Sequence, residues 1–185
     1  MPDRLMTLER IQRLDETLMS RSSALRSAQR DRTLVVVTQT ANLSRLWFGI
    51  AGGLVAFGGR RGRRAACRGA GAIAVASVVS NGPAKWLVRR HRPSASAHPP
   101  LITMPPSTSF PSGHAASGFA FTLAVGAELP ATVPLLAPLA GAVAYSRVHV
   151  GVHYPSDVAA GVAIGLASGL LATYIHRGNE PAKNA

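Results

Sequence analysis

The apolar residues of this 185-residue chain are collected into long runs that short polar stretches separate. Such runs predict helices that cross a membrane, because a crossing helix needs about 20 mainly apolar residues. We expect one span within residues 34–57 and further spans over residues 65–82, 114–129, 133–145 and 158–175. The predicted fold class is therefore all-α, a polytopic membrane helix bundle with about five transmembrane helices.

The first apolar run is the least regular, because polar residues interrupt it at Gln39, Asn42, Ser44 and Arg45. Its uninterrupted part, residues 46–59, is shorter than a crossing helix requires. Either the whole run spans with its polar residues facing protein, or only its second half is deeply inserted. We favour one span preceded by an interfacial lead-in.

Residues 1–32 show a different pattern, in which apolar residues recur every three, four or seven positions among charged ones: Leu5, Leu8, Ile11, Leu14, Leu18 and Leu25. This spacing predicts an amphipathic helix. The helix either lies at the membrane interface or packs on the domain or a partner, and both alternatives use the same periodicity. The predicted organisation is an amphipathic segment over residues 1–32, a membrane domain over 33–176 and a polar tail over 177–185.

Composition supports a membrane protein, since 47% of the residues are hydrophobic and only 15% are charged. The net charge of +12 does not indicate a nucleic-acid partner, because the arginines do not form one face with interleaved aromatic residues. Membrane lipids are the expected contact instead. Cys67 is the only cysteine, which excludes an intrachain disulfide and a cysteine-based metal site, and residues 1–32 contain no apolar stretch typical of a secretory signal.

The basic residues are unevenly placed. No acidic residue occurs between Arg32 and Glu128, and one connection carries Arg60, Arg61, Arg63, Arg64 and Arg68. The positive-inside rule places this connection in the cytoplasm and the opposite ends of the helices on the outer face. Residues 1–32, with seven arginines against five acidic residues, weaken this assignment without reversing it.

The richest chemistry lies in the stretch SRVHVGVHYPSD, residues 146–157. Arg147 is suited to bind an anion, His153 to attack it, and Asp157 to orient the histidine. Pro155 and Ser156 mark a helix start, so the carboxylate of Asp157 falls in the first turn and can reach back to the His153 ring. A phosphate-processing site is the leading interpretation.

A metal site is the rival interpretation of this stretch, because His149, His153 and Asp157 recur at intervals of four. Gly151 and Pro155 argue against a continuous helix that would align them, and the nearby arginines would repel a cation. We therefore expect no metal ligands here and place His149 in the wall of the pocket.

Two earlier stretches supply further groups. In KWLVRRHRP, residues 85–93, Lys85 and Arg92 complement the charge of a phosphoryl group, whereas Arg89 and Arg90 are expected to extend toward lipid phosphates. In PSGH, residues 111–114, Ser112 is expected near a helix N-cap, Gly113 allows close backbone approach, and His114 can protonate a leaving oxygen. The predicted spans bring all three stretches to one face of the membrane.

Together these stretches resemble the signature of the type 2 phosphatidic acid phosphatase (PAP2) superfamily, which also includes bacterial acid phosphatases and vanadium haloperoxidases. The first family motif is a lysine followed, after six residues, by Arg-Pro, and it matches Lys85, Arg92 and Pro93. The second motif is PSGH, which matches in full. The third motif is Ser-Arg, then a histidine after five residues and an aspartate after three more, and it matches Ser146, Arg147, His153 and Asp157. The resemblance extends from about residue 43 to 175 and points to the bacterial membrane lipid phosphatase branch.

The resemblance implies a role for each matched residue. His153 would be the nucleophile that forms a phosphohistidine, Asp157 would orient it, and His114 would be the general acid. The phosphoryl oxygens would be bound by Lys85, Arg92, Ser112, Gly113 and Arg147. It implies neither a metal nor another cofactor. Many membrane members of the family have six spans, whereas the pattern here predicts five.

The expected substrate is a lipid phosphate, such as a polyprenyl phosphate or diphosphate, a polyprenyl-phosphate sugar with a terminal phosphate, or a phosphatidate-like lipid. The motif residues recognise only the phosphate, so they do not distinguish these lipids. The sequence leaves the oligomeric state open. Two alternatives share the same residues: a vanadate-dependent haloperoxidase-like protein and a catalytically silent membrane-binding protein. The intact motifs rank the silent protein last.

Overall fold

The computed structural model describes residues 2–178, with side chains over residues 6–176, and this part of the chain is helical without strands. The helices are α1 (Pro2–Ala24), α2 (Ala28–Thr40), η1 (Asn42–Ser44), α3 (Arg45–Phe57), α4 (Gly59–Asn81), α5 (Pro83–Val88), α6 (Gly113–Glu128), η2 (Pro130–Thr132), α7 (Val133–His149) and α8 (Pro155–Gly178). The all-α prediction is confirmed. The side chains of the predicted polar tail, residues 177–185, lie outside the described part.

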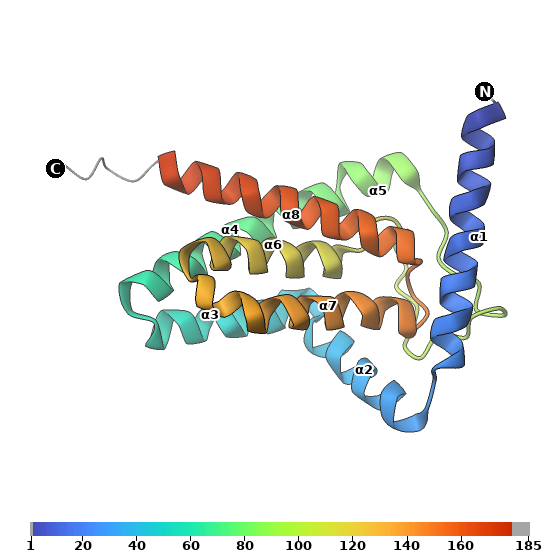
Figure 1. Ribbon diagram of the computed structural model, residues 1–185, viewed down its shortest axis with the longest axis horizontal. Coiled ribbons are helices and arrows are strands. Elements are labelled where there is room, and N and C mark those ends of the chain that lie inside the picture. The colour runs from blue at the N-terminus through green and yellow to red at the C-terminus, as the bar shows by residue number, and fades with distance from the viewer. Residues whose placement is uncertain (1, 179–185) are drawn as a thin grey trace.

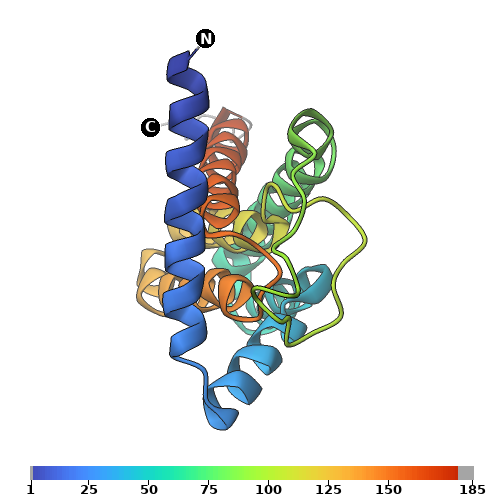
Figure 2. The same cartoon turned by 90° about the vertical axis from the view of Figure 1, so that its right-hand side faces the viewer.

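Five helices, α3, α4, α6, α7 and α8, run along the long axis of the molecule and form the bundle (Figure 1). Helix α1 lies across one end of this bundle, and α2 leads from α1 back to its side. Seen from that end, α1 stands in front of the bundle, and the long loop between α5 and α6 lies beside it (Figure 2). Helix α1 thus covers the end where α7 stops and α8 starts.

The N-terminal region differs from the single helix expected over residues 1–32. Helix α1 ends at Ala24, and α2 begins at Ala28 because Ser27 caps it by accepting a hydrogen bond from the backbone nitrogen of Arg30 at 3.4 Å. A serine at an N-cap satisfies a backbone donor that the first turn leaves unpaired. The segment is therefore two helices that meet at a corner.

The first apolar run is also divided. Between α2 and α3, Leu43 and Ser44 have φ values of 53° and 58°, in the left-handed region that non-glycine residues seldom adopt. The chain turns here, so residues 34–57 belong to two helices instead of one. This agrees with the division into a lead-in and a separate apolar helix.

The other predicted spans coincide with α4, α6, α7 and α8. Within the described residues, two segments are long and apolar enough to cross a membrane, Pro130–His149 and Pro155–His176. These segments suit a membrane protein. The number of crossings stays a prediction, since α3 has 13 residues and α6 has 16.

Helices α6 and α8 pack backbone against backbone. A Cβ atom built on Gly161 would lie 2.4 Å from the carbonyl oxygen of Ser112, and one on Gly165 would lie 2.4 Å from that of Ala116. Small residues four positions apart allow helices to approach this closely. The contact fixes the start of α6 relative to the start of α8.

The opposite end of the bundle carries a charged cluster of its own. The carboxylate of Glu128, at the end of α6, is 2.8 Å from Arg68 Nη1 and 3.1 Å from Arg64 Nη2, both on α4. The side chains of Arg68 and Glu128 are nearly buried, with exposed fractions of 6% and 10%. This cluster ties α4 to α6 far from the three motif stretches.

Candidate active site

The three motif stretches meet at the end of the bundle that α1 covers (Figure 2). A cavity of about 470 Å³ lies between them, and its polar end is lined by Lys85, Arg92, Gly113, His114, Arg147 and His153. Six of the eight predicted site residues therefore line one cavity. The other two, Ser112 and Asp157, are fully buried at the starts of α6 and α8.

The ring of His153 lies between a carboxylate and a guanidinium. Its Nδ1 atom is 3.7 Å from Asp157 Oδ2, and its Nε2 atom is 3.4 Å from Arg92 Nη1. The first distance exceeds a normal hydrogen bond, and such contacts tighten when a substrate binds. One nitrogen thus faces the orienting carboxylate, and the other faces the basic residues of the cavity.

The surroundings of His153 keep its imidazole neutral. Burial, with the charges of Arg147 and Arg92, lowers the pKa of His153 from 6.5 to about 4, although Asp157 opposes this shift. A buried histidine beside cations loses its proton readily, because both effects disfavour the charged ring. At neutral pH, Nε2 can therefore carry a free electron pair.

Asp157 is held by several donors. Its Oδ1 accepts a hydrogen bond from Arg90 Nη1 at 3.0 Å, and its Oδ2 accepts from the backbone nitrogen of Tyr154 at 2.9 Å and from the hydroxyl of Ser109. Helix α8 begins at Pro155, so Asp157 lies in the first turn as predicted. These contacts fix the carboxylate beside the histidine.

The basic residues of the cavity are positioned mainly by the loop between α5 and α6. Arg92 donates to the carbonyl oxygens of Val152 at 2.6 Å and Ser107 at 2.9 Å, and Lys85 Nζ donates to the Ser107 hydroxyl at 3.1 Å. Burial and then the charge of Arg92 lower the pKa of Lys85. The two cations are thus held close together without an acidic residue between them.

Arg147 enters the cavity from the last turn of α7. Its Nη1 donates to the hydroxyl of Thr38 on α2, while its buried Nε has no hydrogen-bond partner among the described residues. The side chain is almost fully buried, with an exposed fraction of 2%. A buried donor without a protein partner is rare, and a bound ligand would supply one.

The PSGH stretch forms the start of α6. Ser112 stands at the N-cap position as expected, but its buried hydroxyl makes no cap hydrogen bond and has no partner in the described part of the chain. Its backbone nitrogen donates to the carbonyl oxygen of Asp157 at 3.0 Å, which joins the two helix starts. The Ser112 hydroxyl is therefore available for a ligand.

His114 also lines the cavity. Its Nε2 is 3.0 Å from Oδ1 of Asn42, the first residue of η1. Asn42 therefore fixes the orientation of the ring. The sequence analysis assigned no role to Asn42, which lies 72 positions away and outside every motif.

Arg90 was expected to extend toward lipid phosphates, and this prediction is wrong. Its side chain is turned into the protein, where Nη1 contacts Asp157 and Nη2 donates to Asp15 Oδ2 of α1 at 2.7 Å. The guanidinium also lies 4.0 Å from the centre of the Tyr154 ring. Buried carboxylates on either side stabilise the charge more than an interfacial position would. Arg89, by contrast, is exposed.

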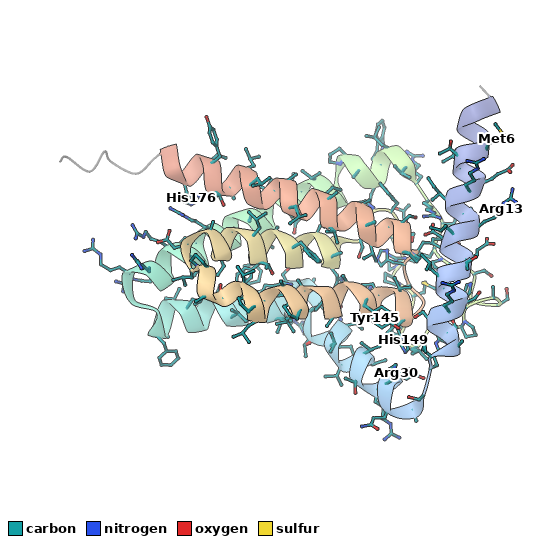
Figure 3. The ribbon with its side chains drawn as sticks, viewed as in Figure 1. Met6, Arg13, Arg30, Tyr145, His149 and His176 are labelled. Carbon is teal, nitrogen blue, oxygen red and sulfur yellow. The ribbon has the colours of Figure 1, made fainter. Side chains whose placement is uncertain are left out.

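His149 does not line the cavity, contrary to expectation. Its Nε2 is 2.7 Å from Asp31 Oδ1 on α2, and its Nδ1 is 3.4 Å from the Ser22 hydroxyl on α1. Figure 3 shows His149 and Tyr145 at the end of α7 that faces these two helices. His149 therefore joins the N-terminal helices to the bundle and does not converge with His153 and Asp157, and the described residues contain no cluster of metal-ligand type.

The sequence model of the PAP2 superfamily matches residues 66–181, more than half of the chain. The chain belongs to the PAP2 superfamily. All eight predicted site residues fall within the matched part. Membership of this superfamily supports a phosphatase. No curated protein matches the sequence.

Two solved structures share the fold of this PAP2 superfamily protein. The first transmembrane PAP2-type phosphatidylglycerolphosphate phosphatase from Bacillus subtilis has a TM-score of 0.72 and 21% sequence identity, over 94% of this chain and 89% of that chain. LpxE from Aquifex aeolicus has a TM-score of 0.71 and 22% identity, over 85% of this chain and 93% of that chain. Both similarities extend over most of this chain.

Proposed function

We propose that this PAP2 superfamily protein is a metal-independent membrane phosphatase that hydrolyses a lipid phosphate through a phosphohistidine intermediate. The arrangement of His153 carries the proposal. Its Nδ1 faces Asp157 while its Nε2 faces the cavity beside Arg92, as an attacking nitrogen would require. The low pKa of this ring favours the neutral, nucleophilic form.

In the first step, Nε2 of His153 attacks phosphorus, and the bond to the leaving oxygen breaks. His114 donates a proton to that oxygen, and Asp157 stabilises the positive charge that develops on the His153 ring. In the second step, water attacks the phosphohistidine, and His114 accepts a proton from it. Phosphate leaves, and both histidines return to their starting forms.

The phosphoryl oxygens would be bound by Lys85, Arg92 and Arg147, with the Ser112 hydroxyl and the backbone at Gly113. The unpartnered Arg147 Nε and Ser112 Oγ atoms support this assignment. A Cβ atom on Gly113 would make only ordinary contact with protein, 3.7 Å from Asn81 Oδ1. Close approach of a ligand, rather than crowding by protein, would therefore explain a glycine there.

A lipid substrate is favoured by the mixed lining of the cavity. Besides the charged residues, the lining includes the apolar residues Leu43, Phe48, Ile73 and Ala74 of η1, α3 and α4. A phosphate bound by the charged residues would leave its hydrocarbon chain near these apolar side chains. The phosphatidylglycerolphosphate phosphatase of similar fold is consistent with such a substrate.

The proposed orientation places the site on the outer face of a multi-pass cell-membrane protein. The Arg60 to Arg68 cluster lies in the first turns of α4, which starts at the opposite end of the bundle from the cavity (Figure 1). A cytoplasmic location for these arginines follows from the positive-inside rule. A cysteine-accessibility assay on the α5–α6 loop in intact cells would test the orientation.

The function itself is tested by phosphate release from a panel of lipid phosphates by the purified protein in excess EDTA. We expect release that survives EDTA and falls by at least about 10⁴-fold in His153→Ala, because the nucleophile is removed. His176→Ala is the matched control, since His176 lies at the far end of α8 (Figure 3). Release that EDTA abolishes, or that His153→Ala retains, would contradict the mechanism.

A further inference from the structure

Arg90 joins the catalytic end of the bundle to α1. One of its terminal nitrogens, Nη1, donates to Asp157 Oδ1 at 3.0 Å, and the other, Nη2, donates to Asp15 Oδ2 at 2.7 Å. Asp15 and Asp157 have exposed fractions of 2% and 0%. A single guanidinium thus bridges two buried carboxylates that lie more than 140 positions apart in the sequence.

Asp15 also holds the start of α8 directly. Its Oδ1 accepts a hydrogen bond from the backbone nitrogen of Ser156 at 2.8 Å, and its Oδ2 accepts one from the Ser156 hydroxyl at 2.6 Å. Ser156 is in the first turn of α8, where a carboxylate pairs with free backbone donors and with the positive end of the helix dipole. Asp15 therefore acts on both Arg90 and the residue beside Asp157.

The burial of Asp15 is not explained by an amphipathic helix alone. A helix that only lies on a membrane keeps its charged side chains on the face turned to water. In α1, however, Asp15 points at the bundle together with Met19 and Ser22, which have exposed fractions of 1% and 7%. Burying a carboxylate is costly unless charged and polar partners compensate, and Arg90 and Ser156 are those partners here.

We propose that Asp15 is a positioning residue for the phosphatase reaction, acting through Arg90 on Asp157 and hence on the nucleophile His153. This rests on the proposed function of His153. Asp15 draws one side of the Arg90 guanidinium away from Asp157 and fixes the other side against Oδ1. Oδ2 of Asp157 is then left to face Nδ1 of His153.

Loss of the Asp15 charge would free Arg90 to pair fully with Asp157. A guanidinium prefers to bind both oxygens of a carboxylate side by side. Nη2 of Arg90, then held only by Gln12, would compete with Tyr154 and Ser109 for Oδ2. The carboxylate would shift toward Arg90, and the His153 ring would lose the oxygen that faces its Nδ1. The phosphate-binding residues Lys85, Arg92 and Arg147 do not contact Asp15 and would keep their places.

The test compares Asp15→Asn, Arg90→Gln and the double variant in the full-length protein. We expect Asp15→Asn to lower kcat by between about 10-fold and 100-fold, as small misplacements of catalytic groups do, with less than about a threefold change in KM. The loss of kcat in the double variant should be clearly smaller than the product of the two single losses, because Asp15 acts mainly through Arg90 and only in part through Ser156. Multiplying effects of the two substitutions would overturn the proposal.

The control is Asp31→Asn. Asp31 also joins the N-terminal region to the bundle, through His149 at 2.7 Å, but it does not contact Arg90 or Asp157. We expect this variant to lower Tm and to leave kcat within about twofold of the unmodified enzyme. An equal loss of kcat in both variants would mean that general loosening of α1 and α2 is responsible, and Asp15 would have no special role.

A second measurement does not depend on hydrolysis. In protein labelled with ¹⁵N histidine, the chemical shifts of His153 report which ring nitrogen carries the proton. We expect mainly the Nδ1–H form in the unmodified protein and a mixture of forms in Asp15→Asn. A changed tautomer without phosphate release from any lipid would retain the link from Asp15 to His153 and reject the proposed function. An unchanged tautomer together with unchanged kcat would reject the link.

Discussion

The two ends of the bundle each carry a charged cluster, and their compositions are reversed. At the site end, one arginine, Arg90, lies between the carboxylates of Asp15 and Asp157. At the far end, one carboxylate, Glu128, lies between the guanidinium groups of Arg64 and Arg68. Each cluster joins two helices, and its carboxylates are buried or nearly buried.

The difference lies in what the clusters touch. Asp157 is 3.7 Å from His153, whereas Glu128 pairs with Arg64 and Arg68 at the opposite end of the bundle from the site. A buried ion pair is therefore not by itself a sign of function. It becomes relevant to catalysis when one member also orients a reacting group.

The largest difference in activity between variants at the two ends is expected between Arg147→Lys and Arg68→Lys. Both arginines are buried, but a lysine at position 147 loses the planar group that would bind two phosphoryl oxygens. We expect kcat/KM to fall by about 10²-fold in Arg147→Lys, as when one transition-state donor is removed. Steady-state kinetics should show no more than about a twofold change in kcat/KM for Arg68→Lys. A comparable loss in both variants would contradict the proposed difference between the two ends.

A smaller effect, on stability rather than activity, is expected from Glu128→Gln. The neutral side chain leaves Arg68 buried without its counter-charge, which costs roughly 3–5 kcal/mol in comparable pairs. Thermal unfolding in detergent should show a Tm lower by several degrees. The kcat per folded molecule should stay unchanged. A fall in kcat with an unaltered Tm would contradict a purely structural role for Glu128.

The smallest effect is expected from acidification between pH 7 and pH 5. Because burial and the nearby arginines lower the pKa of His153 to about 4, the ring stays neutral and nucleophilic through this range and is protonated only as the pH falls through about 4. Titration of the His153 imidazole by NMR, assigned with His153→Ala, would measure this directly. A midpoint near 6.5, the value of an unperturbed histidine, would contradict the electrostatic account.

The motif residues could be predicted from the sequence because their spacing and the alternation of apolar runs bring them to one end of the bundle. Pro155 and Ser156 correctly predicted the helix start that carries Asp157, and PSGH correctly predicted the start of α6. Short-range signals of this kind depend on local backbone chemistry. These local signals therefore do not depend on the tertiary contacts of the rest of the chain.

The supporting residues could not be predicted in this way. Asp15 and Arg90 are 75 positions apart, and Asn42 and His114 are 72 apart, so no local pattern links them. The periodicity of residues 1–32 is equally compatible with a helix on the membrane and a helix on the domain. The turn at Leu43 and Ser44 contains neither glycine nor proline, the residues from which a turn is commonly predicted. His149 was wrongly placed in the wall of the pocket, because its partners come from α1 and α2.

The close packing of α6 on α8 has a consequence for how the site can move. Gly161 and Gly165 bring the backbones together at Ser112 and Ala116, so the helix that carries His114 and the helix that carries Asp157 form a single rigid unit. The proposed acid His114 and the orienting residue Asp157 therefore keep a fixed separation. For the proposed lipid substrate, we expect entry past Leu43 and Phe48, and widening the cavity there should change which lipids are accepted without altering the chemistry.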